Sequence, residues 1–584
     1  MPVLLNQRPF ILAGFLFFQF SCALAQGTRE DYQRAEEIRT TFPDALKSSS
    51  FKYQWCDRGL IFEHTVAGQK KYSRIDGTSA ETMTMKEAKK KGRLENFFQL
   101  PPLGSWSKSG GQQIPVTLTF QNTFDRPVRV FWVQHDGKLK HYGSIPAGKH
   151  RSFSTFDGHQ WLVDFSPDKL TGIFSASAWD CTATIDTNSQ QRAMKGFQKN
   201  LKINGPNKDK LKAELFRRDN NVWLRSTEQD HQITTDGHQD DPFLNRFHYA
   251  PNGEYAIGFQ ETRVTGRQIP LLASAPHDQL QPTMQWIEYA KAGDTVPQRR
   301  PRLFNLIEQR ALPCDDSTFL DSWNVRFLRW SPDSARAYVL FNQRGHQQLA
   351  LRSIEAQTGL LRDIVNETSE TFIDYSQKTM IRWLDQSNEL VWASERDGWN
   401  HLYRFDAVTG NQINQITKGE WVVRRIEHVD EDRSVIWFAA MGIYPDQDPY
   451  HVHLARINFD GTGLVILTDG DGTHQWEFNA DRSLFVDRWS RVDLPEIAQL
   501  RAAKDGTVVA DLFTHDISEV SRHNFTSPIR FSSVGRDNQT MIYGTLILPS
   551  NFNPEKSYPV IEHIYAGPHD FHVRKQFGGH ISQR

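Results

Sequence analysis

A phenol near the C-terminus is the side chain whose setting first suggests chemistry. Residues 558–568 read Tyr-Pro-Val-Ile-Glu-His-Ile-Tyr-Ala-Gly-Pro. β-Branched residues bounded by Pro and Gly predict a buried strand that ends at Tyr565, with a Gly-Pro loop after it. A phenol at a strand end beside such a loop could direct a hydrogen-bond donor into a site.

Two adjacent carboxylates form the second candidate. Asp240 and Asp241 lie in the stretch Gly-His-Gln-Asp-Asp-Pro at 237–242. Paired carboxylates concentrate negative potential, so they could hold the ammonium group of a substrate. The alternative, which we favour, is a solvated turn without a ligand.

A third candidate combines aromatic rings with hydroxyl and imidazole groups. Alternating runs at 116–120 and 127–133, followed by an Asp-Gly turn, predict a small β-sandwich. A flat ring can pack on Trp, while Tyr, Thr and His can meet a polar substituent. Alternatively, the Trp residues belong to the core and the His is structural.

The chain beyond residue 204 is repetitive, and its repeats must position these groups. Each unit contains a strand, a turn such as Ser-Pro-Asp at 331–333, and a second strand. Unit starts recur every 45 to 53 residues, at Leu328, Ile381, Ile426 and Trp476. Four-stranded propeller blades repeat at about 40 to 50 residues. We therefore expect a mainly β fold, with seven or eight propeller blades and the sandwich inserted near its start. Several sandwiches in a row fit this spacing less well.

Charge and composition narrow the classes of function. The 68 basic and 69 acidic side chains give a net charge of −1, so we expect no nucleic-acid partner. Asp469–His474 resembles a calcium loop only superficially, because a downstream Glu at the required spacing is missing. No Cys pair has zinc-ligand spacing, and we assign neither a metal nor a cofactor.

The N-terminus has the features of an export signal. Arg8 precedes an apolar run at 10–18, and Ala23-Leu24-Ala25 offers a small-x-small cleavage site. The run is short for a membrane span of about 20 residues. We expect cleavage after residue 25, a secreted or periplasmic protein, and no stable membrane span.

The predicted sandwich resembles the β domain of the von Hippel-Lindau tumour suppressor. The resemblance covers roughly 116–175 and rests on the order Pro-Val-x-Val-x-Trp, Asp-Gly, Tyr, Pro-x-Gly and Gly-His-x-Trp-Leu. In that family a peptide carrying hydroxyproline lies in a groove with an aromatic wall. The resemblance implies that Trp132, Tyr142, Thr155, His159 and Trp161 form such a groove here and would bind such a peptide, with Thr155 in place of a Ser.

Most of the remaining chain resembles the N-terminal part of dipeptidyl peptidase IV-type members of the prolyl oligopeptidase family. The similar motifs are Tyr-Ala-Lys-Ala-Gly at 289–293, Ser-Glu-Arg-Asp-Gly-Trp-Asn-His-Leu-Tyr at 394–403, Thr-Lys-Gly-Glu-Trp at 417–421 and the tail at 546–568. The tail is similar to the first strands of that family's α/β-hydrolase domain. The resemblance implies that Tyr565 donates its phenol to the oxyanion of the tetrahedral intermediate.

Two departures from that family limit what the resemblance implies. The Ser-His-Asp machinery needs a G-x-S-x-G elbow, and the chain contains none. We therefore expect one oxyanion donor and no complete catalytic triad in this polypeptide. The family's paired glutamates, which hold the substrate amine, are also missing; Asp240 and Asp241 lie in the corresponding region. Release of dipeptides is thus an open question.

Two functions follow as hypotheses. The first is an exported serine-type peptidase acting on proline-containing peptides, present here without its triad segment, with a possible homodimer. The alternative is a non-catalytic protein that binds proline- or hydroxyproline-bearing segments. The expected parts are a signal peptide at 1–25, the start of the propeller and a linker at 26–112, the sandwich at 113–184, the propeller at 185–526, and an incomplete α/β-hydrolase domain at 527–584.

Overall fold

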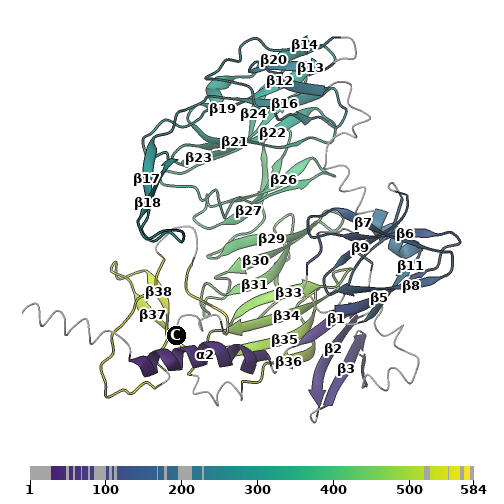
Figure 1. Ribbon diagram of the computed structural model, residues 1–584, viewed down its shortest axis with the longest axis vertical. Coiled ribbons are helices and arrows are strands. Elements are labelled where there is room, and N and C mark those ends of the chain that lie inside the picture. The colour runs from purple at the N-terminus through teal and green to yellow at the C-terminus, as the bar shows by residue number, and fades with distance from the viewer. Residues whose placement is uncertain are drawn as a thin grey trace, which may run out of the picture. The chain divides into compact units, whose positions relative to one another are not determined.

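The computed structural model describes residues 28–47, 51–56, 59–66, 69–76, 79–83, 100, 102–103, 108–110, 115–166, 169–176, 180–194, 214–225, 229–517, 526–549, 551–565 and 571–578. These residues are mostly in antiparallel strands (Figure 1). The chain divides into two compact units, one of residues 1–189, 439–455 and 465–584 and the other of residues 190–438 and 456–464. Each is described by itself. The predicted signal peptide lies outside the described residues.

The sandwich consists of two sheets with alternating buried side chains. One sheet has the order β10-β9-β6-β7 and the other the order β11-β5-β8, in which β11 runs parallel to β5. Phe120, Trp161 and Phe174 fill the space between the sheets and are almost fully buried. The strands are β5 (Pro115–Asn122), β6 (Val128–Val133), β7 (Leu139–Ile145), β8 (His150–Phe156), β9 (Gln160–Ser166), β10 (Lys169–Ser175) and β11 (Cys181–Ile185).

The first unit also contains the N-terminal sheet and the last sheet of the repeats. Trp55 and Phe62 of the N-terminal sheet pack against Val486 and Leu500 of the last one. The elements are α2 (Arg29–Lys47), β1 (Lys52–Cys56), β2 (Gly59–Val66), β3 (Gln69–Asp76), β4 (Ser79–Met83), β33 (Thr473–Phe478), β34 (Leu484–Arg491), β35 (Leu494–Ala502), β36 (Val508–Thr514), and a separate hairpin of β37 (Ile529–Val534) and β38 (Met541–Leu546).

The second unit is a succession of sheets and one projecting hairpin. Its sheets have the orders β12-β13-β14, β15-β16-β19-β20, β21-β22-β23-β24 and β25-β26-β27-β28, and β17 pairs only with β18. The elements are β12 (Glu214–Arg218), β13 (Asn221–Arg225), β14 (His231–Gln232), β15 (His248–Tyr249), β16 (Tyr255–Glu261), β17 (Gln268–Ala273), β18 (Thr283–Glu288), β19 (Arg299–Asn305), β20 (Arg310–Leu312), η2 (Asp316–Phe319), β21 (Ser322–Trp330), β22 (Arg336–Gln343), β23 (Gln348–Glu355), β24 (Leu361–Thr368), β25 (Ile381–Leu384), β26 (Glu389–Ser394), β27 (His401–Asp406) and β28 (Gln412–Gln415).

One further sheet has the order β29-β30-β31-β32, with strands at Val422–Asp430, Val435–Met441, Val452–Asn458 and Val465–Ile466. Repeated four-stranded antiparallel sheets are the blades expected from the sequence repeats, and the β-propeller class with a small sandwich is confirmed.

A glycine turn between the third and fourth strands recurs in successive blades. Gly359, Gly410, Gly461 and Gly506 all have φ between 76° and 86°. Residues that carry a side chain rarely adopt this backbone conformation. At each turn, a Cβ atom added to the glycine would also lie only 2.0 to 3.0 Å from a backbone carbonyl oxygen of an earlier segment. The repeat therefore has a steric cause at these positions.

The prediction of a buried strand ending at Tyr565 is wrong. Residues 559–565 have no strand conformation, and Val560 and Ile561 are 87% and 91% exposed. A short apolar run becomes a buried strand only where neighbouring strands accept its backbone hydrogen bonds. In the described part of 526–578, β37 and β38 pair with each other and leave this run without a partner strand.

Candidate functional site

The groove residues predicted in the sandwich lie together around one hydroxyl group. Thr155 lies on β8 and Trp161 on β9, joined by the tight turn that contains His159. The Trp161 Nε1–H donates to Thr155 Oγ1 over 3.2 Å, and Thr155 Oγ1 lies 3.1 Å from His159 Nδ1. All three side chains are more than 90% buried. They form a hydrogen-bonded base rather than an open wall.

The two other groove residues lie against this base and remain partly accessible. The Trp132 ring stacks on His159 with centroids 5.0 Å apart, and the Tyr142 ring meets the edge of Trp161 at 5.1 Å. Both side chains are half-buried. Within the described residues, the buried Trp132 Nε1 has no hydrogen-bond partner. The accessible parts of the cluster are thus portions of the Trp132 and Tyr142 side chains, an aromatic ring and a phenol that could contact a ligand.

The imidazole of His159 is held in its neutral form. Burial lowers its pKa below the ordinary value of 6.5, and the nearby His135 lowers it further, while Asp157 acts in the opposite direction. A neutral ring can accept at one nitrogen and donate at the other. This property suits the recognition of a hydroxyl group.

Asp240 and Asp241 have different surroundings. The Asp241 carboxylate is paired with the guanidinium of Arg300, and Gln260 Nε2 donates to Asp241 Oδ2 over 3.1 Å. Asp240 is exposed in the turn, where its carbonyl oxygen accepts from the Arg263 N–H. Arg300 neutralises the Asp241 carboxylate and so weakens the negative potential of the pair. Binding of a substrate ammonium by Asp240 and Asp241 stays a prediction.

Tyr565 is 58% exposed, and its ring centroid lies 6.2 Å from that of His572. The Gly-Pro loop expected after it lies outside the described residues. The structure therefore gives Tyr565 an accessible phenol and leaves its predicted catalytic role untested.

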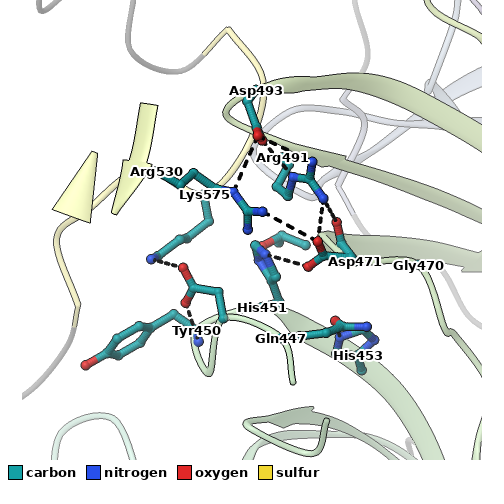
Figure 2. A network of polar contacts seen from close by, with 12 residues as sticks. Gln447, Tyr450, His451, His453, Gly470, Asp471, Arg491, Asp493, Arg530 and Lys575 are labelled. Atoms are coloured by element: carbon teal, nitrogen blue, oxygen red, sulfur yellow. Dashed lines mark hydrogen bonds and ion pairs between the residues drawn. The ribbon is translucent and has the colours of Figure 1, made fainter. Parts of the chain in front are cut away.

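A charged network that sequence reasoning missed lies in the first unit. Figure 2 shows its side chains converging from the last blades, the β37–β38 hairpin and the C-terminal segment. We call it the charged clasp; its members are Asp448, His451, Asp471, Arg491, Asp493, Arg530 and Lys575. One ion pair joins residues 127 positions apart, a separation for which the sequence pattern carries no signal.

The described residues contain no group of three or more His, Cys, Asp or Glu side chains arranged to hold a metal ion. Among the helices that the structure describes, none combines the length and apolar character needed to span a bilayer.

Comparisons with known proteins identify the propeller and its insert. Residues 205–496 match the family model described as the dipeptidyl peptidase IV (DPP IV) N-terminal region, and residues 108–169 match the VHL beta domain. The fold is a β-propeller that carries an inserted VHL-type β-sandwich. The chain belongs to the family defined by the dipeptidyl peptidase IV N-terminal region.

Among curated relatives, a probable dipeptidyl peptidase 4 of Aspergillus flavus is 22% identical over 346 residues, which cover 56% of this chain and 44% of the relative. A probable dipeptidyl-aminopeptidase B of Coccidioides posadasii is 22% identical over 479 residues, covering 72% of this chain and 48% of the relative. The chain thus spans less than half the length of these relatives.

Two solved structures are also similar. A putative dipeptidyl aminopeptidase IV from Bacteroides ovatus has a TM-score of 0.48 and 16% identity, covering 90% of this chain and 68% of that one. Porphyromonas gingivalis dipeptidyl peptidase 4 has a TM-score of 0.48 and 13% identity, with coverages of 93% and 71%.

Proposed function

We propose that this chain supplies the propeller, sandwich and first hydrolase segment of an exported serine-type peptidase that acts on proline-containing peptides. The observation that carries the proposal is the family match over residues 205–496, together with curated relatives named dipeptidyl peptidases. The propeller would screen access, and a serine in a segment beyond the 584 residues would attack the scissile carbonyl.

Tyr565 would donate its phenol to the oxyanion in that peptidase. Its exposure supports this role, because an oxyanion donor has to reach the substrate rather than a core partner. A backbone N–H beside the nucleophile would supply the second donor.

The reading frame beyond Arg584 provides the first test, since a continuing frame with a G-x-S-x-G elbow supports the proposal. The continued product should then hydrolyse a fluorogenic Gly-Pro substrate. Replacing Tyr565 with Phe should lower kcat by roughly 100- to 1000-fold. The matched control is Tyr289→Phe, which removes another exposed phenol. Turnover by the 584-residue chain alone would contradict the expectation that its catalytic triad is incomplete. Inactivity of the longer product would refute the proposed peptidase function.

A binding protein without catalysis is the second candidate, and the Thr155-centred cluster favours it. A hydroxyproline-containing peptide would place its ring against the aromatic side chains and its hydroxyl near His159. Titration with matched peptides carrying hydroxyproline or proline tests this recognition. Tyr142→Phe and His159→Gln remove polar groups while leaving the buried Trp161 in place. Equal affinity for both peptides, or unchanged affinity in both variants, would remove this candidate.

Export is part of the proposal and rests on the apolar run at 10–18 and the cleavage site before Gln26. N-terminal sequencing of the mature protein from the medium or periplasm should start at Gln26. An intact N-terminus on protein recovered only from the cytoplasm would refute export.

We also propose a homodimer through the projecting β17–β18 hairpin. The Tyr289 N–H donates to the Arg267 carbonyl, so by alternation Met284 and Trp286 direct their N–H groups outward from β18. Pro270 provides no such donor at the centre of β17. Met284 and Trp286 are 58% and 59% exposed. Residues 283–287 carry no charge, so two copies of β18 can pair about a twofold axis without like-charge repulsion.

A further inference from the structure

The charged clasp contains a buried ion pair that ties the C-terminal segment to the loop before β31. Lys575 Nζ donates to Asp448 Oδ2 over 2.6 Å, and the side chains are only 8% and 10% exposed. The other carboxylate oxygen, Oδ1, accepts from the Tyr450 N–H over 3.0 Å. Lys575 also lies 5.0 Å from the centroid of the Tyr450 ring, which contacts the ring of Phe571. Charge, hydrogen bonding and aromatic packing therefore hold residues 571–578 at one place.

A second ionic group ties the β37–β38 hairpin to the last blade. Arg530 on β37 lies 3.6 Å from Asp471 Oδ2 and 3.4 Å from Asp493 Oδ2. Arg491 on β34 bridges the same two carboxylates, donating from Nε to Asp493 Oδ1 over 2.6 Å and pairing with Asp471 through Nη1. Arg530 is one-third exposed, so this group is open to screening by salt, unlike the buried Lys575 pair.

His451 lies between these two attachments. Figure 2 shows its ring below Arg530, with Asp471 on one side and Lys575 on the other. Nδ1 lies 3.3 Å from Thr473 Oγ1 and Nε2 lies 3.5 Å from Asp471 Oδ1. The side chain is 1% exposed, and within the described residues neither His451 Nε2 nor Asp471 Oδ1 has a hydrogen-bond partner.

We propose that the charged clasp fastens the β37–β38 hairpin and residues 571–578 to the last blades and opens on mild acidification, with His451 as the group that takes up the proton. The two fastened segments bracket residues 551–565, which carry Tyr565. Opening the clasp would therefore release that stretch at both ends. This inference does not depend on the proposed peptidase activity.

The charges that face His451 determine the direction of the response. Burial lowers its pKa to about 4, Lys575 and Arg530 act in the same direction, and Asp448 and Asp471 oppose them. Arg491 and Asp493 complete the clasp, and the neighbouring His453 also remains neutral, with its pKa lowered to about 3. The native pKa lies below the ordinary value of 6.5, so the closed form is fully favoured above pH 6.5 and is progressively disfavoured as the pH falls towards 4.

Amide hydrogen exchange of the full chain tests the clasp. Dividing each exchange rate by the rate of the unfolded chain at the same pH gives the equilibrium constant for local opening. If His451 regains an ordinary pKa in the open form, the opening equilibrium of 526–549 and 571–578 should rise roughly 30-fold between pH 7.5 and 5.0. Lys575→Met should open 571–578 at pH 7.5. Arg530→Gln should lower the protection of the β37–β38 hairpin. Added salt should also lower protection, and more strongly in the hairpin than in residues 571–578, because the Arg530 ion pairs are more exposed than the Lys575 pair.

Matched variants separate the clasp from general acid sensitivity. His451→Gln should abolish most of the pH response, while His453→Gln should keep it, because His453 is held by Gln447 and Thr468 away from the two segments. Lys556→Met, within residues 551–565, and Arg536→Gln, between β37 and β38, remove exposed charges and should leave protection unchanged. Strand β23 of the second unit serves as an internal reference for folding, because the sandwich is itself expected to respond to pH through His159. An unchanged pH response in His451→Gln, or unchanged protection of 571–578 in Lys575→Met, would overturn the proposal.

Discussion

Replacing Thr155 with Val removes one oxygen atom from the buried cluster of Thr155, His159 and Trp161 while nearly preserving the shape of the side chain. That oxygen accepts the indole N–H of Trp161 and contacts His159 Nδ1. Trp161 is 1% exposed, so its N–H cannot turn to water. A buried donor left without an acceptor costs about 1–3 kcal/mol. We therefore expect Thr155→Val to destabilise the sandwich by about 2 kcal/mol.

Thr155→Ser is the matched comparison, because it keeps the hydroxyl and removes a methyl group at a cost of about 1 kcal/mol. Native-state hydrogen exchange of the amides in β9 measures the stability of the sandwich separately from that of the blades. A loss of 2 kcal/mol corresponds to opening about 30 times more often. Hydroxyproline-peptide affinity should fall in the Val variant and persist in the Ser variant. Protection of β9 in Thr155→Val equal to or greater than that in Thr155→Ser would refute the argument.

Three further predictions address other parts of the chain. Because burial lowers the His159 pKa, the sandwich should be most stable above pH 6.5 and lose stability as the pH falls below that value, as thermal unfolding of the sandwich would show. Asp241→Asn removes the nearer of the two carboxylates paired with Arg300 and leaves only Asp316, which lies 3.9 Å from Arg300 Nε. Because the Asp241 and Arg300 side chains are less than 20% exposed, hydrogen exchange in β19 should show a loss of about 2 kcal/mol, whereas Asp240→Asn should change it by less than about 0.5 kcal/mol. Trp286→Glu should convert the dimer to monomer in light scattering after size-exclusion chromatography, since two copies of β18 would then carry opposed carboxylates.

Each of these predictions has a contradicting outcome. A pH profile that is identical in His159→Gln would assign the acid response to another group. Equal destabilisation by Asp240→Asn and Asp241→Asn would show that the Arg300 pair is not the cause. A Trp286→Glu variant with the mass of the unmodified protein would place any dimer contact elsewhere.

The sandwich and the blades were predictable because their signals are local. Alternation with period two marks which side chains face inward, and it correctly indicated strands such as β5 and β6. The recurring turns, including the positive-φ glycines at 359, 410, 461 and 506, mark the blade repeat. The convergence of Trp132, Tyr142, Thr155, His159 and Trp161 could be expected because the resemblance supplied a three-dimensional template.

The errors and omissions share a physical origin. The apolar run before Tyr565 has the composition of a buried strand, yet strand formation depends on a neighbouring edge that the run itself does not encode. Asp241 and Arg300 are 59 residues apart, and their pairing depends on the register between β16 and β19 and on the turn beside them. Local composition could not distinguish that neutralised carboxylate from a free one.

By itself, the sequence determined the class of the fold, the insertion of a sandwich into a propeller, the family resemblance and the absence of a G-x-S-x-G elbow within the 584 residues. These features reside in short-range patterns and motif order. Only the tertiary structure decided that Thr155, His159 and Trp161 form a closed hydrogen-bonded base and that Lys575 is buried against Asp448. The reason is that burial and charge pairing depend on which distant segments exclude water from a side chain.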